Sequence, residues 1–489
     1  MAQVPALQVL VPLLCAPLCV LLRSRTVAWL LFLIAALSSL GCAVVLAARV
    51  ASGETLRYAM GAWPAPQGIE YVIGPFNTPV LLLGSGIAVV VAVYSRRSIA
   101  AEVETKRISL VYACMCLMLA GLLGITATGD AFNAFVFLEI TSLSSYALIA
   151  VGPRRRALLA TFRYLVIGTV GAVFIVIGIG LAYAVTGTLN MADLAQRLTA
   201  VQGNRALYAA CIFLFVGLAI KMALLPLHAW LPAAYAEAPS AVSMFLSATG
   251  TKIAIYLFLR FAFTVFGAGL VFSTLRIGLI GLLLASLAML IGSAVACFQT
   301  DLKYLLAWSS IAQIGYIMAG VSLATRSGLS AAYLHLINHA VLKAALFGAA
   351  GLVLYQLGSG KLTALAGLGR RMPWTFGAIL LAGLGLIGVP PTAGFVSKWA
   401  LATALIEDGQ WSVLVAVLVS SLLALVYVGR IVEVAWFRDP PQGAEAKKAP
   451  VSMVAAIWCL VLLSVYFGLD ATLPAGLAES AATALLGGD

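Results

Sequence analysis

Long apolar runs recur along the whole of this 489-residue chain, and they exclude an ordinary soluble fold. Many runs reach the roughly 18 residues or more that an α-helix needs to cross the hydrocarbon core of a bilayer. Only 9% of the residues are charged, against roughly 25% in soluble domains. The alternating segments of about ten residues that are typical of transmembrane β-barrels do not occur. The sequence therefore predicts an all-α polytopic membrane protein.

The apolar runs, divided at charges, glycines and prolines, predict fourteen transmembrane helices. Their expected ranges are 5–22, 27–48, 73–94, 108–127, 131–151, 160–186, 206–236, 239–264, 273–298, 302–323, 329–355, 374–406, 411–437 and 451–470. Two of them, 206–236 and 374–406, are too long for one simple crossing. Because proline removes a helical hydrogen bond, we expect broken helices at Pro226 in the seventh span and at Pro390 and Pro391 in the twelfth.

The distribution of lysine and arginine orients the spans in the membrane. Loops after odd-numbered spans carry seventeen of these cations, and loops after even-numbered spans carry six. Since cytoplasmic loops are enriched in Lys and Arg, we expect a cell-membrane protein with both termini on the outer side. Arg260 and Arg430 lie near span ends, where a long side chain reaches the headgroups. Topology thus explains the net charge of +12, and we expect no nucleic-acid partner.

Four lysines and one glutamate lie inside otherwise apolar spans. An ionisable group in mid-bilayer costs several kcal/mol unless it faces the bundle interior, so such groups are functional candidates. They are Glu139, Lys221, Lys252, Lys343 and Lys398. For any one residue the alternative is a structural ion pair or a side chain that reaches the interface. Five together favour a proton path through the bundle.

Polar side chains in helical register accompany these charges. Tyr146 follows Glu139 by seven residues, Ser247 belongs to a stripe of hydroxyl residues beside Lys252, and Gln313 lies in a similar stripe on the tenth span. We interpret them as supporting residues of a hydrated route. Without the charges, such stripes would equally well bond one helix to another.

The three histidines of the chain all lie in or beside the same elements. His228 follows Pro226 in the broken seventh span, while His335, His339 and Lys343 are spaced i, i+4 and i+8 on the eleventh. Histidine titrates near neutral pH, which suits a proton relay. Zinc is the alternative for two histidines on one face, but HLINH lacks the glutamate of a zinc protease and no further ligands accompany it. We therefore expect no metal site.

Other classes of membrane protein fit the pattern less well. An intramembrane enzyme would need a nucleophile with a base, or a metal set, and neither signature appears, so we expect no active site. A stand-alone transporter would bind an organic substrate at the midplane, and transport by the purified single subunit would identify it. An inert scaffold would have no use for buried lysines in register.

The two broken spans indicate an internal repeat. Pro226 and Pro390 are 164 residues apart, which suggests that spans four to eight recur in spans nine to thirteen. Since five spans are an odd number, the two copies must be inverted in the membrane. The expected organisation is 1–107 for helices 1–3, 108–264 for the first repeat and proton entry half-channel, 273–437 for the second repeat and proton exit half-channel, and 451–489 for helix 14 and the tail.

Five segments resemble the antiporter-like subunits shared by multisubunit Mrp-type Na+/H+ antiporters and the membrane arm of respiratory complex I. They read FLEITSLSSYALIA, LAIKMALLPLHAWLPAAYAEAPSAVSMFLSATGTK, DLKYLLAWSSIAQIGY, HLINHAVLKAALF and LIGVPPTAGFVSKW. The likeness extends from about residue 70 to about residue 440. It implies fourteen helices, an inverted pair of five-helix repeats, and proton translocation without a bound cofactor. It also implies other membrane subunits as partners, with H+ and Na+ as the transported ions.

The resemblance further implies roles for single residues. Glu139 and Lys221 match the family's glutamate and lysine pair of the fifth and seventh helices, and Lys252 matches its connecting lysine on the eighth. As a mechanism, we expect Lys221 to stay protonated while Glu139 is close. It then releases the proton towards Lys252 when the carboxylate withdraws or is neutralised.

The second half of the expected path follows from the same likeness. His335, His339 and Lys343 fall on the central polar axis, and Lys398 matches the exit-side residue of the broken twelfth helix. That exit residue is lysine in the D subunit of Mrp antiporters and in some complex I subunits, and glutamate in another. The D subunit of an Mrp-type antiporter is therefore the closest likeness. A complex I or membrane-hydrogenase subunit is the alternative.

Overall fold

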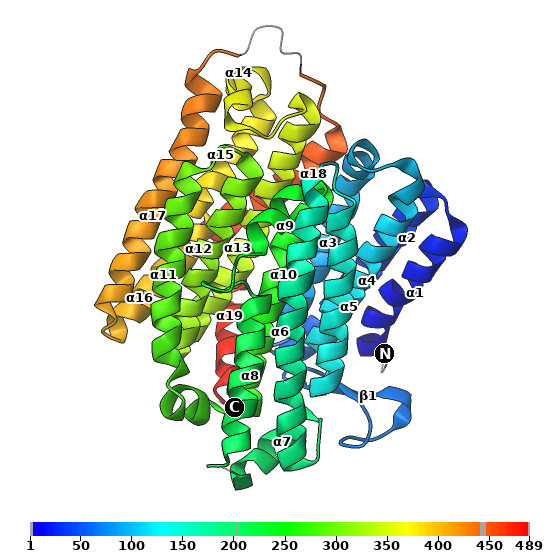
Figure 1. Ribbon diagram of the computed structural model, residues 1–489, viewed down its shortest axis with the longest axis vertical. Helices are drawn as coiled ribbons and strands as arrows, with labels where there is room; N and C mark the ends of the chain where they lie inside the picture. The colour runs from blue at the N-terminus through cyan, green and yellow to red at the C-terminus, as the bar shows by residue number, and fades with distance from the viewer. Residues whose placement is uncertain (1–2, 202, 441–445, 488–489) are drawn as a thin grey trace.

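The computed structural model describes residues 3–201, 203–440 and 446–487, which form a bundle of long helices (Figure 1). In that part of the chain, 12 helices are long and apolar enough to cross a membrane. Their α-helical parts are α1 (Val4–Leu22), α2 (Arg25–Ala51), α3 (Thr78–Glu102), α4 (Ile108–Ala127), α5 (Ala131–Ala150), α6 (Arg156–Thr186), α10 (Ser240–Leu259), α11 (Ile277–Phe298), α12 (Leu302–Leu323), α13 (Arg326–Leu357), α17 (Trp411–Val432) and α18 (Val451–Leu469). The predicted all-α membrane fold is confirmed.

The other two predicted crossings are broken helices, as the prolines indicated. The seventh span divides into α8 (Arg205–Lys221) and α9 (Leu231–Glu237), with Pro226 between them. The twelfth divides into α15 (Pro373–Ile387) and α16 (Ala393–Glu407), with Pro390 and Pro391 between them. Each break leaves carbonyl groups at the end of the first half-helix without helical partners, so these groups are available to side-chain donors.

Short elements lie in the connections between the long helices and, in the case of α19, after the last of them. They are β1 (Leu56–Ala59), β2 (Glu70–Ile73), α7 (Met191–Leu198), α14 (Leu368–Arg371), α19 (Thr472–Leu485) and the π-helical turns Arg260–Val265, Gly269–Thr274 and Glu433–Phe437. The strands pair antiparallel, with Leu56 opposite Ile73. The third span, predicted from residue 73, therefore begins only at Thr78. The predicted start of this span was wrong, because apolar residues of β2 precede the helix and extend the apolar run in the sequence.

The helix α19 was missed by the sequence prediction, which treated residues after 470 as a tail. It follows α18 directly and buries Ala478, Ala481 and Ala482 against the bundle. A helix of 14 residues is about 21 Å long, too short to cross a bilayer alone. Together α18 and α19 pack along α13, whose 32 residues make it about 48 Å long.

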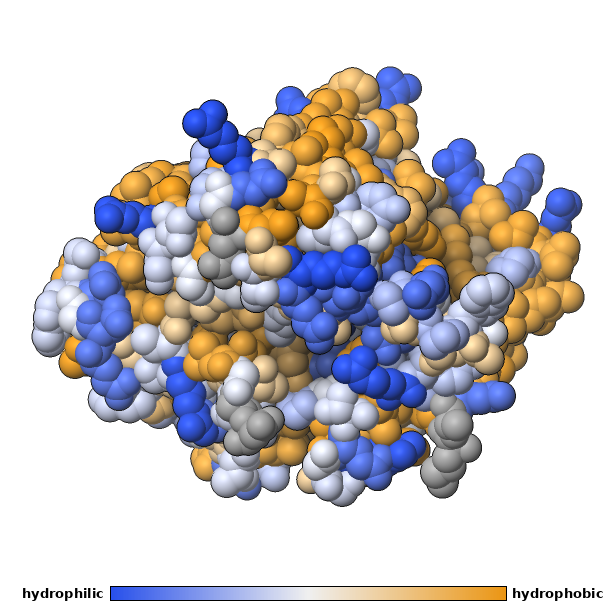
Figure 2. Space-filling view, turned by 90° about the horizontal axis from the view of Figure 1, so that it is seen from below, coloured by the Kyte–Doolittle hydropathy of each residue, from blue (hydrophilic) through white to orange (hydrophobic). Residues whose placement is uncertain are grey.

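The two ends of the chain lie on the same face of the bundle, together with α7 and the hairpin (Figure 1). We call this the terminal face, and the opposite side, where α14 lies, the loop face. Figure 2 looks onto the terminal face, where hydrophilic residues gather among hydrophobic ones. This end of the bundle is therefore polar, while the sides of outer helices such as α1 and α17 expose many leucine and valine side chains.

The helices α5 and α12 begin in the same way at opposite faces. Asp130 caps α5 and forms an isolated β-bridge with Asn190, which precedes α7 on the terminal face. Asp301 caps α12 and forms the same bridge with Lys361, which precedes α14 on the loop face. Each bridge joins residues 60 positions apart in the chain. This correspondence supports the inverted pair of repeats, which we keep as a proposal.

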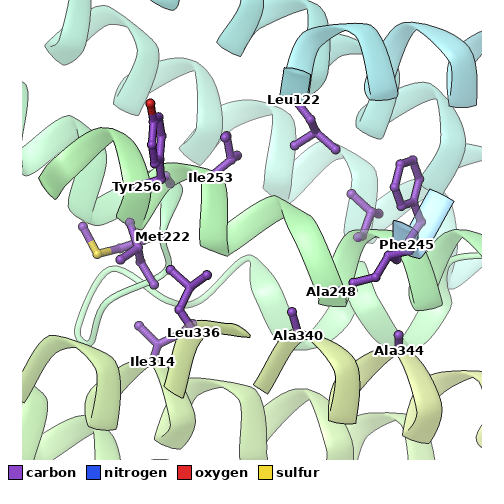
Figure 3. Packing of buried hydrophobic residues seen from close by; sticks show 14 of the residues in the cluster. Leu122, Met222, Phe245, Ala248, Ile253, Tyr256, Ile314, Leu336, Ala340 and Ala344 are labelled. Atoms are coloured by element: carbon purple, nitrogen blue, oxygen red, sulfur yellow. The ribbon is translucent and has the colours of Figure 1, made fainter. Parts of the chain in front are cut away.

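Three interior helices, α10, α12 and α13, carry most of the predicted site. These helices are more deeply buried than the outer ones. In the most apolar 18-residue stretch of α10 and of α12, 94% is buried, against 39% in α1. Figure 3 shows small side chains where α10 meets α13, with Ala248 opposite Ala340 and Ala344. Small residues let the two helices approach closely, so the polar groups on their facing sides come together.

Candidate functional site

All four lysines predicted inside the spans are at least nine-tenths buried. They lie on four different elements, with Lys221 on α8, Lys252 on α10, Lys343 on α13 and Lys398 on α16. Each ammonium group donates hydrogen bonds to oxygen atoms inside the protein. None of the four side chains therefore points into the lipid.

Glu139 and Lys221 form an ion pair between α5 and α8. The Lys221 Nζ donates to Glu139 Oε1 at 3.0 Å and to Ser142 Oγ at 2.8 Å. Ser142 follows Glu139 by three residues, so both side chains lie on one face of α5. Lys221 is the last residue of α8, where Trp230 from beyond the break donates to the Ile220 carbonyl at 2.9 Å. The break thus fixes the ammonium group against the carboxylate.

Tyr146 lies seven residues, about two turns, after Glu139 on α5 and belongs to an aromatic stack. Its ring meets Tyr164 edge-on at 4.7 Å, and Tyr164 stacks on Trp230 at 4.0 Å. A Cβ atom on Gly168 would lie 2.2 Å from the Tyr146 hydroxyl, so only glycine leaves room for it. Within the described part of the chain this hydroxyl has no hydrogen-bond partner. It is therefore available as a donor or acceptor beside the ion pair.

His335 joins α12, α13 and α16. Its Nε2 lies 2.8 Å from Gln313 Oε1, and its Nδ1 lies 2.9 Å from Ser397 Oγ. Ser397 was not among the predicted residues, although it directly precedes Lys398 in the motif FVSKW. Since both ring nitrogens have partners, the imidazole is held in one orientation.

His339 and Lys343 continue the same face of α13. The rings of His335 and His339 are nearly parallel, with centroids 6.0 Å apart. Neither ring nitrogen of His339 has a hydrogen-bond partner among the described residues. Lys343 Nζ donates to the Leu306 carbonyl at 2.8 Å and to Ser309 Oγ at 2.6 Å on α12.

Lys252 faces this histidine pair from α10. Its ammonium group donates to the Ser247 carbonyl of its own helix. Its helix packs along α13, which carries His335, His339 and Lys343. The small residues of Figure 3 account for this proximity, because they bring α10 and α13 together.

Lys398 occupies the break of the twelfth span. Its Nζ donates to the Leu386 carbonyl at 2.8 Å, to the Ile387 carbonyl at 3.1 Å and to Ser421 Oγ at 3.1 Å. It also lies 4.5 Å above the centre of the Tyr316 ring. The two carbonyls end α15, so the ammonium group lies at the negative end of that helix dipole.

The predicted residues thus form two groups. Glu139 and Lys221 make one, and Lys252, the two histidines, Lys343 and Lys398 make the other. Within the residues that the structure describes, Lys221 bonds only to Glu139 and Ser142. His228 belongs to neither group, because it is half-buried in the break and faces Trp308 at 5.3 Å.

Two cations lie deeper than the sequence indicated. Lys303, counted as a loop residue, is 6% exposed and donates to the Ala238 carbonyl at 2.9 Å and to Ser243 Oγ at 3.3 Å. Arg260, expected at the headgroups, is 7% exposed and bonds inside the bundle. Lys303 and Arg260 lie near helix ends, which the sequence analysis expected to be exposed. In the structure, neighbouring segments cover these helix ends.

A buried acidic residue was also missed. Glu237 is 2% exposed and accepts a hydrogen bond from the Tyr304 hydroxyl at 3.1 Å. Arg154 lies 4.0 Å from Glu237 and 3.7 Å from Asp301. This cluster joins the break after α8 to the start of α12. In the sequence, Glu237 is the single glutamate of AYAEAPS. It was missed because it falls between two predicted spans, 206–236 and 239–264, and not inside an apolar run.

Known proteins resemble this chain in both sequence and structure. The profile described as NADH:quinone oxidoreductase/Mrp antiporter, TM matches residues 127–424. NADH-quinone oxidoreductase subunit N of Desulforudis audaxviator is 41% identical over 454 residues, covering 92% of this chain and 90% of that protein. The D subunit of the Na(+)/H(+) antiporter of Bacillus subtilis is 29% identical over 483 residues, covering 98% of this chain and 96% of that protein.

A chain of the Mrp complex from Dietzia sp. DQ12-45-1b has the same fold. It matches with a TM-score of 0.90 and 27% identity, over 99% of this chain and 98% of that chain. The matched profile contains every one of the buried lysines and both histidines of α13. The resemblance predicted from the five motifs is confirmed, and the chain belongs to the NADH:quinone oxidoreductase/Mrp antiporter transmembrane family.

Proposed function

We propose that this chain translocates protons as one subunit of a multisubunit Na+/H+ antiporter. The observation that carries the proposal is the state of the buried lysines. Among the described residues only Lys221 has a carboxylate partner, while Lys252, Lys343 and Lys398 bond to neutral oxygen atoms. An uncompensated ammonium group inside a membrane protein costs several kcal/mol. In a row of such groups, each lysine can lose and regain a proton after its neighbour. We propose that the subunit acts in this way and has no active site of its own.

Transfer would begin at the ion pair. While its carboxylate lies 3.0 Å from the ammonium group, Glu139 stabilises the protonated form of Lys221. Withdrawal or neutralisation of Glu139 leaves that charge uncompensated. The proton then moves to Lys252 through water, because no direct contact joins the two lysines in the described structure.

The second group would carry the proton onward. From Lys252 it passes to His339 and His335, whose two ring nitrogens allow release on one side and uptake on the other. From His335, which lies 2.9 Å from Ser397, the proton reaches Lys398 at the break of the twelfth span, while Lys343 takes part at the other end of the same row on α13. Because these groups interact, their titrations belong to the network rather than to single residues.

A second candidate is a proton-pumping membrane subunit of NADH:quinone oxidoreductase. The 41% identity to subunit N of that enzyme favours it, whereas the antiporter relative is 29% identical. A related membrane hydrogenase complex belongs to the same alternative. The two candidate functions share the proton path and differ in the energy source and in the partner subunits.

For the orientation we propose that the loop face is cytoplasmic. The seventeen cations of the odd-numbered connections support this, since such residues are retained on the inside. Both termini would then lie outside, on the terminal face of Figure 1.

Inside-out vesicles that contain the complete complex test these proposals. With an acid interior, addition of NaCl should raise the interior pH if the complex is an antiporter. Addition of NADH and quinone should lower it if the complex is respiratory. Vesicles from a strain without this chain are the control. A pH response that is equal with and without the chain would contradict both candidate functions.

A further inference from the structure

A wide apolar groove opens at the loop face between α15 and α18. Its volume is about 740 Å³, and its apolar wall includes Trp374, Trp458, Val451 and Val454. The two indole rings meet edge-on at 5.7 Å, and Trp458 Nε1 donates to the Trp374 carbonyl at 3.1 Å. We call this cavity the tryptophan groove. Its wall is a fixed arrangement of aromatic surface at one end of the bundle.

Three cations line the same groove, namely Arg371, Lys447 and Lys448. The backbone of Lys447 is held by Gln356 of α13, through a bond from its N–H at 3.0 Å and one to its carbonyl at 3.3 Å. Within the described residues, neither lysine forms an ion pair with a carboxylate. Both lysines are exposed, so their charges are available to a ligand in the groove.

We propose that the tryptophan groove binds an anionic phospholipid of the adjoining leaflet. The phosphate would contact the lysines, and the acyl chains would lie along Trp374, Trp458 and Val454. Indole rings are favoured at headgroup depth because one edge is polar and the face is apolar. Clustered cations attract anionic lipids by about 1 kcal/mol per residue. A soluble anion would contact the cations but not the apolar wall. A partner helix with a neutral face would leave the cations of the groove without counter-charges, so its binding is less favourable.

Native mass spectrometry of the purified complex tests the proposal, with phosphatidylglycerol as the added probe. The double variant Lys447→Ala, Lys448→Ala should bind phosphatidylglycerol about 30-fold more weakly than the natural complex. The matched control is Arg155→Ala, Arg163→Ala, which removes two exposed cations from the same side but outside the groove. The control should retain the lipid.

Three results would overturn the lipid proposal. They are equal retention of phosphatidylglycerol in both double variants, equal affinity for zwitterionic phosphatidylcholine, and occupation of the groove by a helix of a partner subunit. If the double variant fails to assemble, Trp458→Ala provides a second test, since it removes apolar wall without changing the charge. It should also weaken phosphatidylglycerol binding.

A second proposal rests on a different part of the molecule, the end of α10. Lys252, Tyr256 and Arg260 follow one another at i, i+4 and i+8, and so lie in one row. Lys252 lines a cavity of about 20 Å³, and Arg260 lines another of about 240 Å³. The larger cavity also includes Arg57 of β1 and Met191 of α7, which places it at the terminal face (Figure 1).

A hydrogen-bonded cluster separates the two cavities. The Thr126 carbonyl accepts from Asn77 Nδ2 at 2.7 Å, from the Tyr256 hydroxyl at 2.9 Å and from Arg260 Nη1 at 3.4 Å. The Tyr256 ring, labelled in Figure 3, stacks on Phe76 at 4.5 Å. Asn77 and Arg260 face the larger cavity, and Thr126 faces the smaller one.

We infer that this cluster is a plug between the terminal face and Lys252. The fixed charge of Arg260 would repel H+ and Na+, as a cation in a pore excludes other cations. The inference rests on the proposed proton path. It adds that the first half of the chain has its own opening to the terminal face, which is closed in this conformation.

Proteoliposomes with the complete complex and a trapped pH dye test the plug. Under an imposed potential, Arg260→Met should raise passive proton leak several-fold, and Tyr256→Phe should raise it less. Arg276→Met, at an exposed arginine, is the control and should leak like the natural complex. An unchanged leak in both Arg260→Met and Tyr256→Phe would overturn the plug alone. Normal coupled transport in Glu139→Ala would instead overturn the proton path.

Discussion

Replacing Glu139 by alanine should reduce proton transport by the assembled complex at least about 100-fold. The substitution leaves the Lys221 ammonium group with only the Ser142 hydroxyl, 2.8 Å away, in a site that is 3% exposed. Loss of one partner of a fully buried pair costs about 3–5 kcal/mol, and the cost is smaller here because the Glu139 side chain is 26% exposed. Lys221 must then lose its proton or move, so the first step of the path is removed. Vesicle transport normalised to the amount of membrane-inserted protein gives the measurement.

A double variant separates proton transfer from a structural role of the pair. Glu139→Gln with Lys221→Met removes both charges and leaves no uncompensated group. If the pair only held α5 against α8, the double variant would recover transport together with the amount of folded protein. We expect the protein level to recover while transport stays lost. The control is Glu479→Gln, which breaks the exposed pair with Arg326 and should change neither quantity.

The helices and their breaks could be predicted because their causes are local in the sequence. The hydropathy of a span depends on contiguous residues. The breaks in the seventh and twelfth spans occur at Pro226 and at Pro390 and Pro391. The buried lysines could be found for a similar reason, since a charge inside an apolar run is costly and is rarely present without a function. Glu139 could be found in the same way, but it lies 82 residues from Lys221, and only the family resemblance indicated that the two form a pair.

The missed features depend on what covers each residue in three dimensions. Lys303 and Arg260 lie near helix ends, where the sequence prediction placed them in contact with water or headgroups. Their helices α12 and α10 are interior, and their ends are covered by the segment around Ala238 and by the hydrogen bonds at Thr126. Hydropathy also passed over α19, because it is too short to cross the bilayer and is buried by packing on α13.

Replacing Gly394 by alanine should destabilise the broken twelfth span and abolish transport. A Cβ atom there would lie 1.8 Å from the Gly385 carbonyl oxygen and 2.8 Å from its carbon. Both are backbone atoms of α15, so no side chain can rotate away to make room. The start of α16 must therefore separate from the end of α15. Overpacking of this kind costs about 1–3 kcal/mol or more, which a lower thermal midpoint in detergent would report.

The loss of transport follows from what α16 holds in place. Lys398 lies one turn after Gly394 and donates to the Leu386 carbonyl across the break, and Ser397 bonds to His335. A shift at Gly394 therefore weakens the exit end of the proposed path and its link to α13 at once. Gly429→Ala on α17 is the matched control, because its Cβ would meet nothing within 4 Å. If Gly394→Ala matched Gly429→Ala in both midpoint and transport, the close contact of α15 with α16 would have no part in the path.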